Sequence, residues 1–300
     1  MNHAIGLDIG GTKIAAGIVS EKGDLIQKET VHSDPTNKES MFSQVVHCVE
    51  ELINHSSIPA NNICGMGVGI PGKVDRENGI AVFQNNLPWS QFPFRERIKK
   101  ATGIERVEID NDVYMAAYAE WNNADMSSDG LFVYITISTG VSCSIIQGGE
   151  FIRGAGFAGE LGLVPVSMRE TGEGMERLER AASGPVIAKK AQKLYGDKNL
   201  TTADVFDKYY HGHVKAQKII EETAFSIAQG IYMLTSIIDP EQIVFGGSVA
   251  NHNPFLVDLI KNKLTPFLLD EQKHILHGMG NSQLKTDQGI IGAGLRVFRG

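Results

Sequence analysis

The chain has 300 residues, a length that suits two lobes rather than one core. Of these residues, 42% are hydrophobic and 21% are charged, which is typical of a soluble globular protein. Its formal net charge of −7 argues against a protein that binds nucleic acid or an acidic membrane through a basic field. Its three cysteines are far apart, which argues against a disulfide framework. The sequence shows no signal-peptide pattern and no apolar run near the roughly 20 residues that span a bilayer. We therefore expect a cytoplasmic protein without a membrane or nucleic-acid partner.

The chain opens with two apolar runs, residues 4–9 and 14–19, which predict two strands joined by a tight turn at Gly10 and Gly11. We expect these glycines to adopt positive φ angles and to keep side chains away from a ligand. The main-chain N–H groups of such a turn can converge on one anion.

Three polar residues lie around this turn. Asp8 ends the first strand, where a carboxylate can hold a divalent cation or its water shell. Thr12 and Lys13 add a hydroxyl group and a positive charge. Together with the glycines, these groups predict a site for a metal-bound polyphosphate. The alternative is an ordinary hairpin in which Asp8 caps the turn.

The rest of the first half alternates strands with helices, which indicates an α/β architecture. The predicted strands are residues 25–31, 63–70, 81–83 and 107–109, and the predicted helices are residues 39–55 and 94–102. A further helix follows residue 112, and residues 122–130 are polar, so we place the boundary between two lobes near residues 113–130.

The second half repeats the strand–turn–strand layout of the first, as expected for duplicated lobes. Residues 131–137 and 141–146 predict strands on either side of Ser138-Thr139-Gly140. A buried strand at 242–245 ends in Gly246 and Gly247, and helices are predicted at 186–195, 215–238, 253–267 and 289–297.

The triplet Asp110-Asn111-Asp112 follows a predicted strand directly and supplies a candidate general base. Phosphoryl transfer to a hydroxyl group needs a carboxylate placed on the departing proton, and Asp112 lies in the first turn of the next helix. The alternative is that Asp112 is only a helix N-cap. Three polar residues in a row are more than a cap requires.

Residues 8–13 read Asp-Ile-Gly-Gly-Thr-Lys and resemble the first phosphate motif of the ROK family of sugar kinases and sugar-responsive repressors. The resemblance runs over essentially the whole chain. It implies an α/β, two-lobed actin-like ATPase (ribonuclease H-like) fold, with duplicated lobes and a cleft between them. We expect an N-terminal lobe of residues 1–120, joined by the last helix at about 286–300, and a C-terminal lobe of residues 121–285.

The resemblance also implies which residues bind the sugar. The triplet is similar to the family's Glu-Asn-Asp motif, in which the Asn binds sugar and the second acid is the base. Other stretches resemble the family's Asn-Leu-Pro loop, its Gly-Glu-x-Gly-His stretch and its Leu-Glu…Ala-Ser-Gly stretch. The implied sugar-binding residues are Gly72, Asn86, Asn111, Glu160 and Glu179. The alternative for Glu179 is a solvated helix residue in a charge-rich segment.

The implied nucleotide-binding residues lie in three glycine-rich turns, which are Asp8 to Lys13 (with Gly10, Gly11 and Thr12), Ser138-Thr139-Gly140, and Gly246-Gly247. The second turn departs from the family, which usually reads Gly-Thr-Gly-Val-Gly-Gly where this chain reads Ser-Thr-Gly-Val-Ser-Cys at residues 138–143. Each added Cβ narrows the approach to the phosphates. Cys143 is by default a packing residue.

A second departure concerns zinc. Many members carry a Gly-His followed by a cysteine loop, whereas here the His position is Leu163 and residues 167–177 contain neither Cys nor His. Leucine cannot ligate zinc. We therefore predict no zinc site, as in a zinc-free branch resembling bacterial glucokinases, N-acetylmannosamine kinases and β-glucoside kinases.

The leading hypothesis is an ATP-dependent sugar kinase that phosphorylates a hexose or a hexose derivative at its 6-hydroxyl group, with Mg²⁺ held through Asp8 or its water shell. The resemblance implies a homodimer. The alternative is a non-catalytic sugar-binding sensor of the same family, although the chain begins at its first strand, with no room for an N-terminal helix-turn-helix, and is acidic. A phosphate-releasing ATPase is a third hypothesis. The sugar stays open between glucose, N-acetylmannosamine and glucosides.

Overall fold

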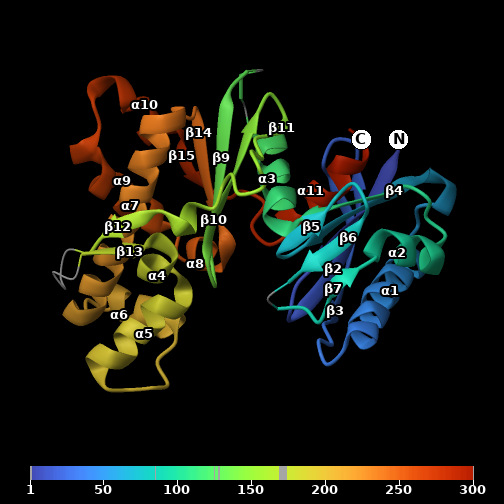
Figure 1. Cartoon of the computed structure of the whole chain (residues 1–300), viewed down its shortest axis with the longest axis horizontal. Helices are drawn as coiled ribbons and strands as arrows, with labels where there is room; N and C mark the ends of the chain where they lie inside the picture. The colour runs from blue at the N-terminus through green and yellow to red at the C-terminus, as the bar shows by residue number, and fades with distance from the viewer. Residues whose placement is uncertain (1, 85, 125, 128, 169–173, 300) are drawn as a thin grey trace. The chain divides into compact units, whose positions relative to one another are not determined.

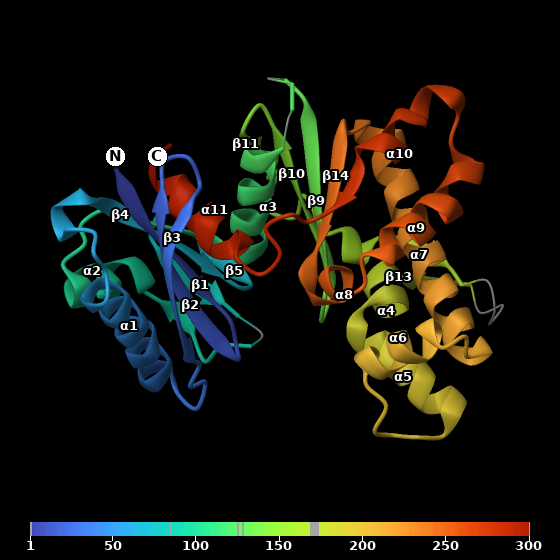
Figure 2. The same ribbon diagram turned by 180° about the vertical axis from the view of Figure 1, so that it is seen from behind.

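Figures 1 and 2 show a computed structural model of the chain, which describes residues 2–84, 86–124, 126–127, 129–168 and 174–299. The chain forms two compact units. Unit 1 comprises Met1–Ala124 and Thr286–Gly300, and unit 2 comprises Asp125–Lys285. The C-terminal segment therefore belongs to the unit in which the chain begins, and unit 1 ends its first segment at Ala124, against the expected 120.

The sheet of unit 1 has five strands in the order β3-β2-β1-β4-β8. These strands are β1 (His3–Ile9), β2 (Lys13–Ser20), β3 (Leu25–His32), β4 (Ile63–Ile70) and β8 (Val107–Asn111). The first three are antiparallel, whereas β4 pairs in parallel with both β1 and β8. The carboxyl ends of β1, β4 and β8 therefore meet at one edge of the sheet.

Helices cover both faces of this sheet (Figure 1). On one face, α1 (Lys38–Asn54) packs its apolar side into a core with the alternate residues Ile5, Leu7 and Ile9 of β1. On the other face, α11 (Gln288–Val297) lies against Gly6 of β1 and Gly67 of β4. The alternation of side chains along a strand separates these two sets.

Glycines let α11 approach its neighbours backbone to backbone. A Cβ on Gly67 would lie 1.8 Å from the carbonyl oxygen of Ala293 in α11. On the opposite side of α11, a Cβ on Gly292 would lie 1.7 Å from the carbonyl oxygen of Met115, in α3 (Asp112–Asn123). No other residue fits at these two positions without moving the backbone.

Smaller elements complete unit 1. A three-stranded sheet contains β5 (Lys73–Asp75), β6 (Ile80–Phe83) and β7 (Ser90–Phe92). The helix α2 (Phe94–Thr102) ends at Gly103, whose φ is 72°, and a 3₁₀ turn spans Ala60–Asn62.

Unit 2 repeats the sheet plan of unit 1, with the order β11-β10-β9-β14-β15. Its strands are β9 (Leu131–Ile137), β10 (Val141–Gln147), β11 (Glu150–Phe151), β14 (Gln242–Gly246) and β15 (Met279–Asn281). As in unit 1, an antiparallel hairpin is followed by strands in parallel register. A separate ribbon pairs β12 (Pro165–Ser167) with β13 (Met175–Arg177).

The core of unit 2 is helix on sheet. Its helices are α4 (Leu178–Ala182), α5 (Gly184–Tyr195), α6 (Thr202–Tyr210), α7 (Val214–Ile238), α8 (Gly247–His252), α9 (Phe255–Leu264) and α10 (His274–Gly278). Short 3₁₀ turns span Leu161–Leu163, Thr265–Phe267 and Asp270–Gln272. Within the described residues, no helix is both long and apolar enough to cross a membrane.

The predicted strands and helices all occur, with two kinds of difference. The single helix predicted at 253–267 is wrong at both ends, because Pro254 precedes α9 and the helix tightens to a 3₁₀ turn at Thr265. Several short elements were not predicted, and α6 among them begins with a capping box between Thr201 and Asp204.

Candidate active site

Asp8 and Asp112 lie at the edge where β1, β4 and β8 end. Asp8 is opposite Gly69 of β4, which is in turn opposite Asp110 of β8. A Cβ on Gly69 would lie 3.3 Å from the Cα of Asp112, so this glycine leaves room for the start of α3. In open α/β sheets, ligands bind outside the carboxyl ends of the parallel strands.

Asn111, rather than Asp112, is the N-cap of α3. The amide oxygen of Asn111 accepts a hydrogen bond from the N–H of Val113 at 2.9 Å, and its Nδ2 donates to the carbonyl oxygen of Gly72 at 2.9 Å. The alternative that Asp112 is only a cap is therefore wrong. Asp112 is the first helical residue, and its Oδ1 shares the Val113 N–H at 3.0 Å.

The electrostatics of the two acids favour a proton on Asp112. Burial, and next the negative charge of Asp8, raise the pKa of Asp112 to about 7. Burial also raises the pKa of Asp8, although the positive charges of Lys13 and Lys28 act in the opposite direction. A carboxyl group with a pKa near 7 is suited to general acid–base chemistry at neutral pH.

The surroundings of Asp8 include three residues that the sequence analysis missed. The carboxylate of Asp8 lies at the first turn of α11, where a Cβ on Gly289 would come within 2.8 Å of its Oδ2. Lys28 of β3 forms an ion pair with Asp287, the N-cap of α11. The only sequence signal was an Asp-x-Gly preceding an apolar helix. The carboxylate of Asp8 therefore lies near the N-terminus of α11 and the positive charges of Lys13 and Lys28.

The backbone conformation of Gly10 and Gly11, in the first turn, differs from the one predicted. Neither Gly10 nor Gly11 has a positive φ, so that prediction is wrong. The N–H of Gly10 donates to the carbonyl oxygen of Lys13 at 2.9 Å. A Cβ on Gly11 would lie 3.1 Å from the carbonyl oxygen of Asn86. This distance is shorter than most Cβ contacts, so glycine eases the close approach of the Asn86 loop.

The Asn86 loop is anchored by the residues that follow it. Leu87 and Trp89 are buried, and the indole N–H of Trp89 donates to the carbonyl oxygen of Lys38 at 3.1 Å. Asn86 itself is exposed. Unit 1 therefore brings a predicted sugar-binding residue against the turn for which the sequence predicts phosphate binding, where Thr12 and Lys13 are also exposed.

Gly72, unlike Gly10 and Gly11, has a positive φ of 83°. A Cβ on it would also lie 2.4 Å from the carbonyl oxygen of Phe83, so both the φ angle and the space require glycine. Its own carbonyl oxygen is the acceptor for Asn111.

The second turn, in unit 2, is held by main-chain hydrogen bonds. The N–H of Ser138 donates to the carbonyl oxygen of Gly140 at 2.9 Å, and the N–H of Gly184 donates to that of Ser138 at 2.8 Å. Thr139, at its tip, is exposed. The start of α5 is thereby tied to the turn that the family resemblance assigns to phosphate.

Glu179 lies against this second turn. Its Oε2 accepts a hydrogen bond from the N–H of Val141 at 3.3 Å, and a Cβ on Gly140 would come within 2.4 Å of the same oxygen. On its other side, a Cβ on Gly162 would lie 3.1 Å from the Cβ of Glu179. Glu179 is exposed, but it is held by the turn and is more than a solvated helix residue.

Glu160 and Cys143 lie near this carboxylate. Partial burial and the negative charge of Glu179 raise the pKa of Glu160. Burial, and then the charge of Glu160, raise the pKa of Cys143 to about 12, so its thiol stays protonated. Cys143 is buried in the core of unit 2, which confirms that it packs there.

The third turn joins β14 to α8. Gly247 has a φ of 85°, and a Cβ on it would lie 2.6 Å from the carbonyl oxygen of Ile137. A Cβ on Gly246 would lie 2.1 Å from the hydroxyl oxygen of Tyr134. The sheet of unit 2 therefore requires both glycines, whatever they do for a nucleotide.

Among the residues that the structure describes, no group of three His, Cys, Asp or Glu side chains could hold a metal ion. Mg²⁺ in proteins usually keeps several waters and is bound by one or two carboxylates together with substrate phosphates. A single carboxylate, that of Asp8, is therefore enough for such a site. Leu163 is 46% exposed. Residues 169–173 of the predicted zinc-free segment lie outside the described residues, and the absence of zinc stays a prediction.

Comparison with known proteins decides the family. The model of the ROK family matches residues 4–297. The chain belongs to the ROK family. Its relatives include a glucokinase of Halalkalibacterium halodurans, 27% identical and covering 98% of this chain and 94% of the relative. Another is a β-glucoside kinase of Listeria monocytogenes, 26% identical and covering 84% of each chain.

A solved structure matches the fold. The ROK glucokinase of Streptomyces griseus in complex with glucose and AMPPNP superimposes with a TM-score of 0.81 at 26% identity, covering 100% of both chains. This ROK protein therefore has the two-lobed actin-like ATPase fold that its sequence predicted.

Proposed function

We propose that this ROK protein is an ATP-dependent sugar kinase that transfers a phosphoryl group to a hexose or a hexose derivative, at the 6-hydroxyl group. The observation that carries the proposal is the placement of Asp112. It is the first residue of α3, at the carboxyl edge of the sheet, with a pKa raised to about 7. Relatives named for glucokinase and β-glucoside kinase activity support the reaction class.

In this proposal Asp112 is the general base. As the sugar hydroxyl oxygen forms its bond to the γ-phosphorus, the hydroxyl proton passes to the Asp112 carboxylate, and the bond from the γ-phosphorus to the leaving oxygen of ADP breaks. Asn111 fixes the start of α3 by its hydrogen bonds to Val113 and Gly72, and so fixes the position of Asp112. Such orientation is a large part of enzymatic rate.

Asp8 is the residue we propose for Mg²⁺, directly or through water. When bound with ATP, the metal ion neutralises charge on the phosphates. Asp8 also has a second role that needs no metal, because its negative charge raises the pKa of Asp112. The exposed Lys13 and the main chain of the first turn are the proposed partners of one phosphate group.

Asn86, Asn111, Glu160 and Glu179 are the proposed sugar ligands, since amides and carboxylates suit hydroxyl groups. Glu179 already accepts a hydrogen bond from Val141, so its remaining oxygen is the one we assign to sugar. The substrate stays open between glucose, glucosides and N-acetylmannosamine.

The test is ADP release with Mg·ATP against a panel of hexoses, amino sugars and β-glucosides. Sugar-dependent turnover with one clear preference is the expected result and names the substrate. A saturable thermal shift with a sugar, but no turnover and no shift with ATP, would instead indicate the non-catalytic sensor.

A further inference from the structure

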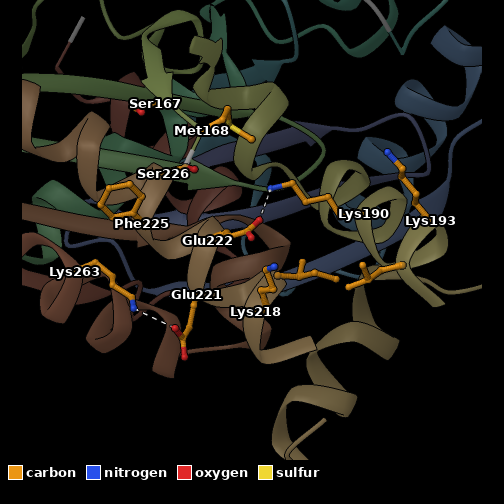
Figure 3. A pocket seen from close by; sticks show the side chains of 12 residues that line it. Ser167, Met168, Lys190, Lys193, Lys218, Glu221, Glu222, Phe225, Ser226 and Lys263 are labelled. Carbon is orange, nitrogen blue, oxygen red and sulfur yellow. Dashed lines mark hydrogen bonds and ion pairs between the residues drawn. The ribbon is translucent and has the colours of Figure 1, made fainter. Parts of the chain in front are cut away.

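Unit 2 contains a pocket of about 530 Å³ that shares no residue with the proposed sugar and nucleotide sites (Figure 3). It is lined by α5, α7, α9 and the end of β12 with Met168. Pockets that bind small molecules commonly enclose about 300–1,000 Å³. The volume therefore suits a ligand of ordinary metabolite size.

The inner surface of the pocket is apolar. The lining residue Ile219 of α7 is only 3% exposed, and the side chains of Phe225 and Met168 lie on either side of Ser226 (Figure 3). The ring of Phe225 also contacts the ring of Phe267, at 6.3 Å between ring centroids. A purely hydrophilic ion would gain nothing from this surface.

The rim of the pocket is positively charged. Its charged residues are four lysines, Lys190, Lys193, Lys218 and Lys263, and two glutamates, Glu221 and Glu222. This is an excess of two positive charges in a chain whose net charge is −7. A local field opposite in sign to that of the whole molecule favours an anionic ligand.

Two ion pairs line the pocket. Lys263 donates a hydrogen bond to Glu221 at 3.3 Å, whereas Lys190 and Glu222 are separated by 3.8 Å, with side chains only 22% and 26% exposed. Partly burying the charges of Lys190 and Glu222 costs free energy, of which so long a pair recovers little. Lys190 is also held by the carbonyl oxygen of Ala181 at 3.0 Å, which fixes its amino group at the pocket.

We propose that this pocket binds a small organic anion, with its anionic group among the lysines and its apolar part against Ile219, Phe225 and Met168. Carboxylate, phosphate and sulfonate groups all satisfy lysine ammonium groups, which act as point charges. A bare inorganic anion leaves the apolar surface unused. A neutral apolar molecule desolvates the lysines without compensation.

The test uses the fluorescent probe 8-anilinonaphthalene-1-sulfonate, which has one anionic group on an apolar body, with the full chain. The pocket variant is Lys193→Glu/Lys218→Glu. The matched control is Lys189→Glu/Lys198→Glu, which makes the same change of net charge at exposed residues outside the pocket. All four positions are exposed, so we expect both variants to fold.

We expect the pocket variant to bind the probe about tenfold or more weakly than wild type, and the control to bind within twofold of wild type. The neutral analogue N-phenyl-1-naphthylamine should bind weakly to all three proteins. Saturating Mg·ADP should leave the probe in place. Millimolar inorganic phosphate should not displace it.

Three outcomes would overturn the proposal. Equal affinities in the pocket and control variants would show that the lysines do not hold the probe. Displacement by Mg·ADP would locate the probe in the nucleotide site. A change of oligomeric state in the pocket variant alone, seen by size-exclusion chromatography with light scattering, would show that a second copy of the chain covers the pocket. None of these results bears on the kinase proposal.

Discussion

The two hairpins that open the two sheets share one plan but differ in charge. The turn of unit 1 lies beside Asp8, whose pKa is raised by burial and only partly offset by the positive charges of Lys13 and Lys28. The turn of unit 2 instead holds the carboxylate of Glu179, whose Oε2 accepts a hydrogen bond from the N–H of Val141. The two hairpins thus share a backbone plan but differ in the charged groups around it.

A second contrast concerns how each sheet is covered. In unit 1, glycines on β1 and β4 let α11 pack directly on the strands. In unit 2, the edge strand β15 carries Gly280, around which a Cβ would meet nothing within 4 Å. Glycine is therefore essential at Gly67 of unit 1 and dispensable at Gly280 of unit 2.

The largest expected effect is on the acid cluster of unit 1. Asp112→Asn removes the base but keeps the shape, and we expect kcat to fall by about 10²–10⁴-fold. The control is Asp75→Asn, a partly buried carboxylate at the end of β5 in the same unit that accepts hydrogen bonds from Asn78. Its kcat should stay within twofold of wild type. A variant Asp112→Asn that keeps most of its turnover would remove Asp112 from the mechanism.

Glycine replacement tests the contrast between the sheets. Gly67→Ala forces a Cβ to within 1.8 Å of the Ala293 carbonyl oxygen, and we expect a loss of about 3 kcal/mol or more in unfolding free energy. Gly280→Ala should change it by less than about 0.5 kcal/mol. Urea denaturation measures both. Similar losses in the two variants would contradict the packing described for α11.

Removing the charge of Glu179 tests the contrast between the hairpins. A carboxylate on the Val141 N–H repels a phosphate group at the same turn, so we expect Glu179→Gln to bind Mg·ADP about 3- to 10-fold more tightly without sugar. The matched control, Glu176→Gln, removes a charge that faces Arg180 and should leave the affinity unchanged. Calorimetric titration gives both values. Weaker binding by Glu179→Gln would contradict this reasoning.

A smaller effect is expected on the pH dependence of stability. The folded pKa of Asp112 is about 7 and its ordinary value is 3.8. Between these values the folded state binds the extra proton, so stability falls as pH rises through this range. Asp112→Asn should therefore raise Tm by a few degrees at pH 8 and leave it nearly unchanged at pH 4. An equal shift at both pH values would contradict the raised pKa.

Much of this arrangement was predictable from local sequence. Apolar runs around glycines predict the strand–turn–strand layouts. The polar triplet at the end of a predicted strand indicates where Asp112 lies, in the first turn of the next helix. That Gly10 and Gly11 lack a positive φ was not predictable from this pattern, and Asn86, which a Cβ on Gly11 would crowd, is distant in sequence. Local pattern does not distinguish a glycine needed for its φ angle from one needed for space.

The residues that the sequence analysis missed are those whose roles depend on distant partners. Lys28 forms an ion pair with Asp287, which is far from it in sequence, and Gly289 matters only because Asp8 lies against it. The hydrogen bond from Val141 to Glu179 likewise joins a strand to a separate helix. Such contacts are created by tertiary packing, which periodicity and motif spacing do not encode.

The most direct test of the central claim is the pH dependence of kcat/KM for ADP release by the wild-type protein, with the preferred sugar. If Asp112 is the base, the rate should rise about tenfold per pH unit below an apparent pKa near 7 and level off above it. A profile that is flat from about pH 5.5 to 8.5 would contradict the account, because no carboxyl group with a raised pKa would then control the reaction.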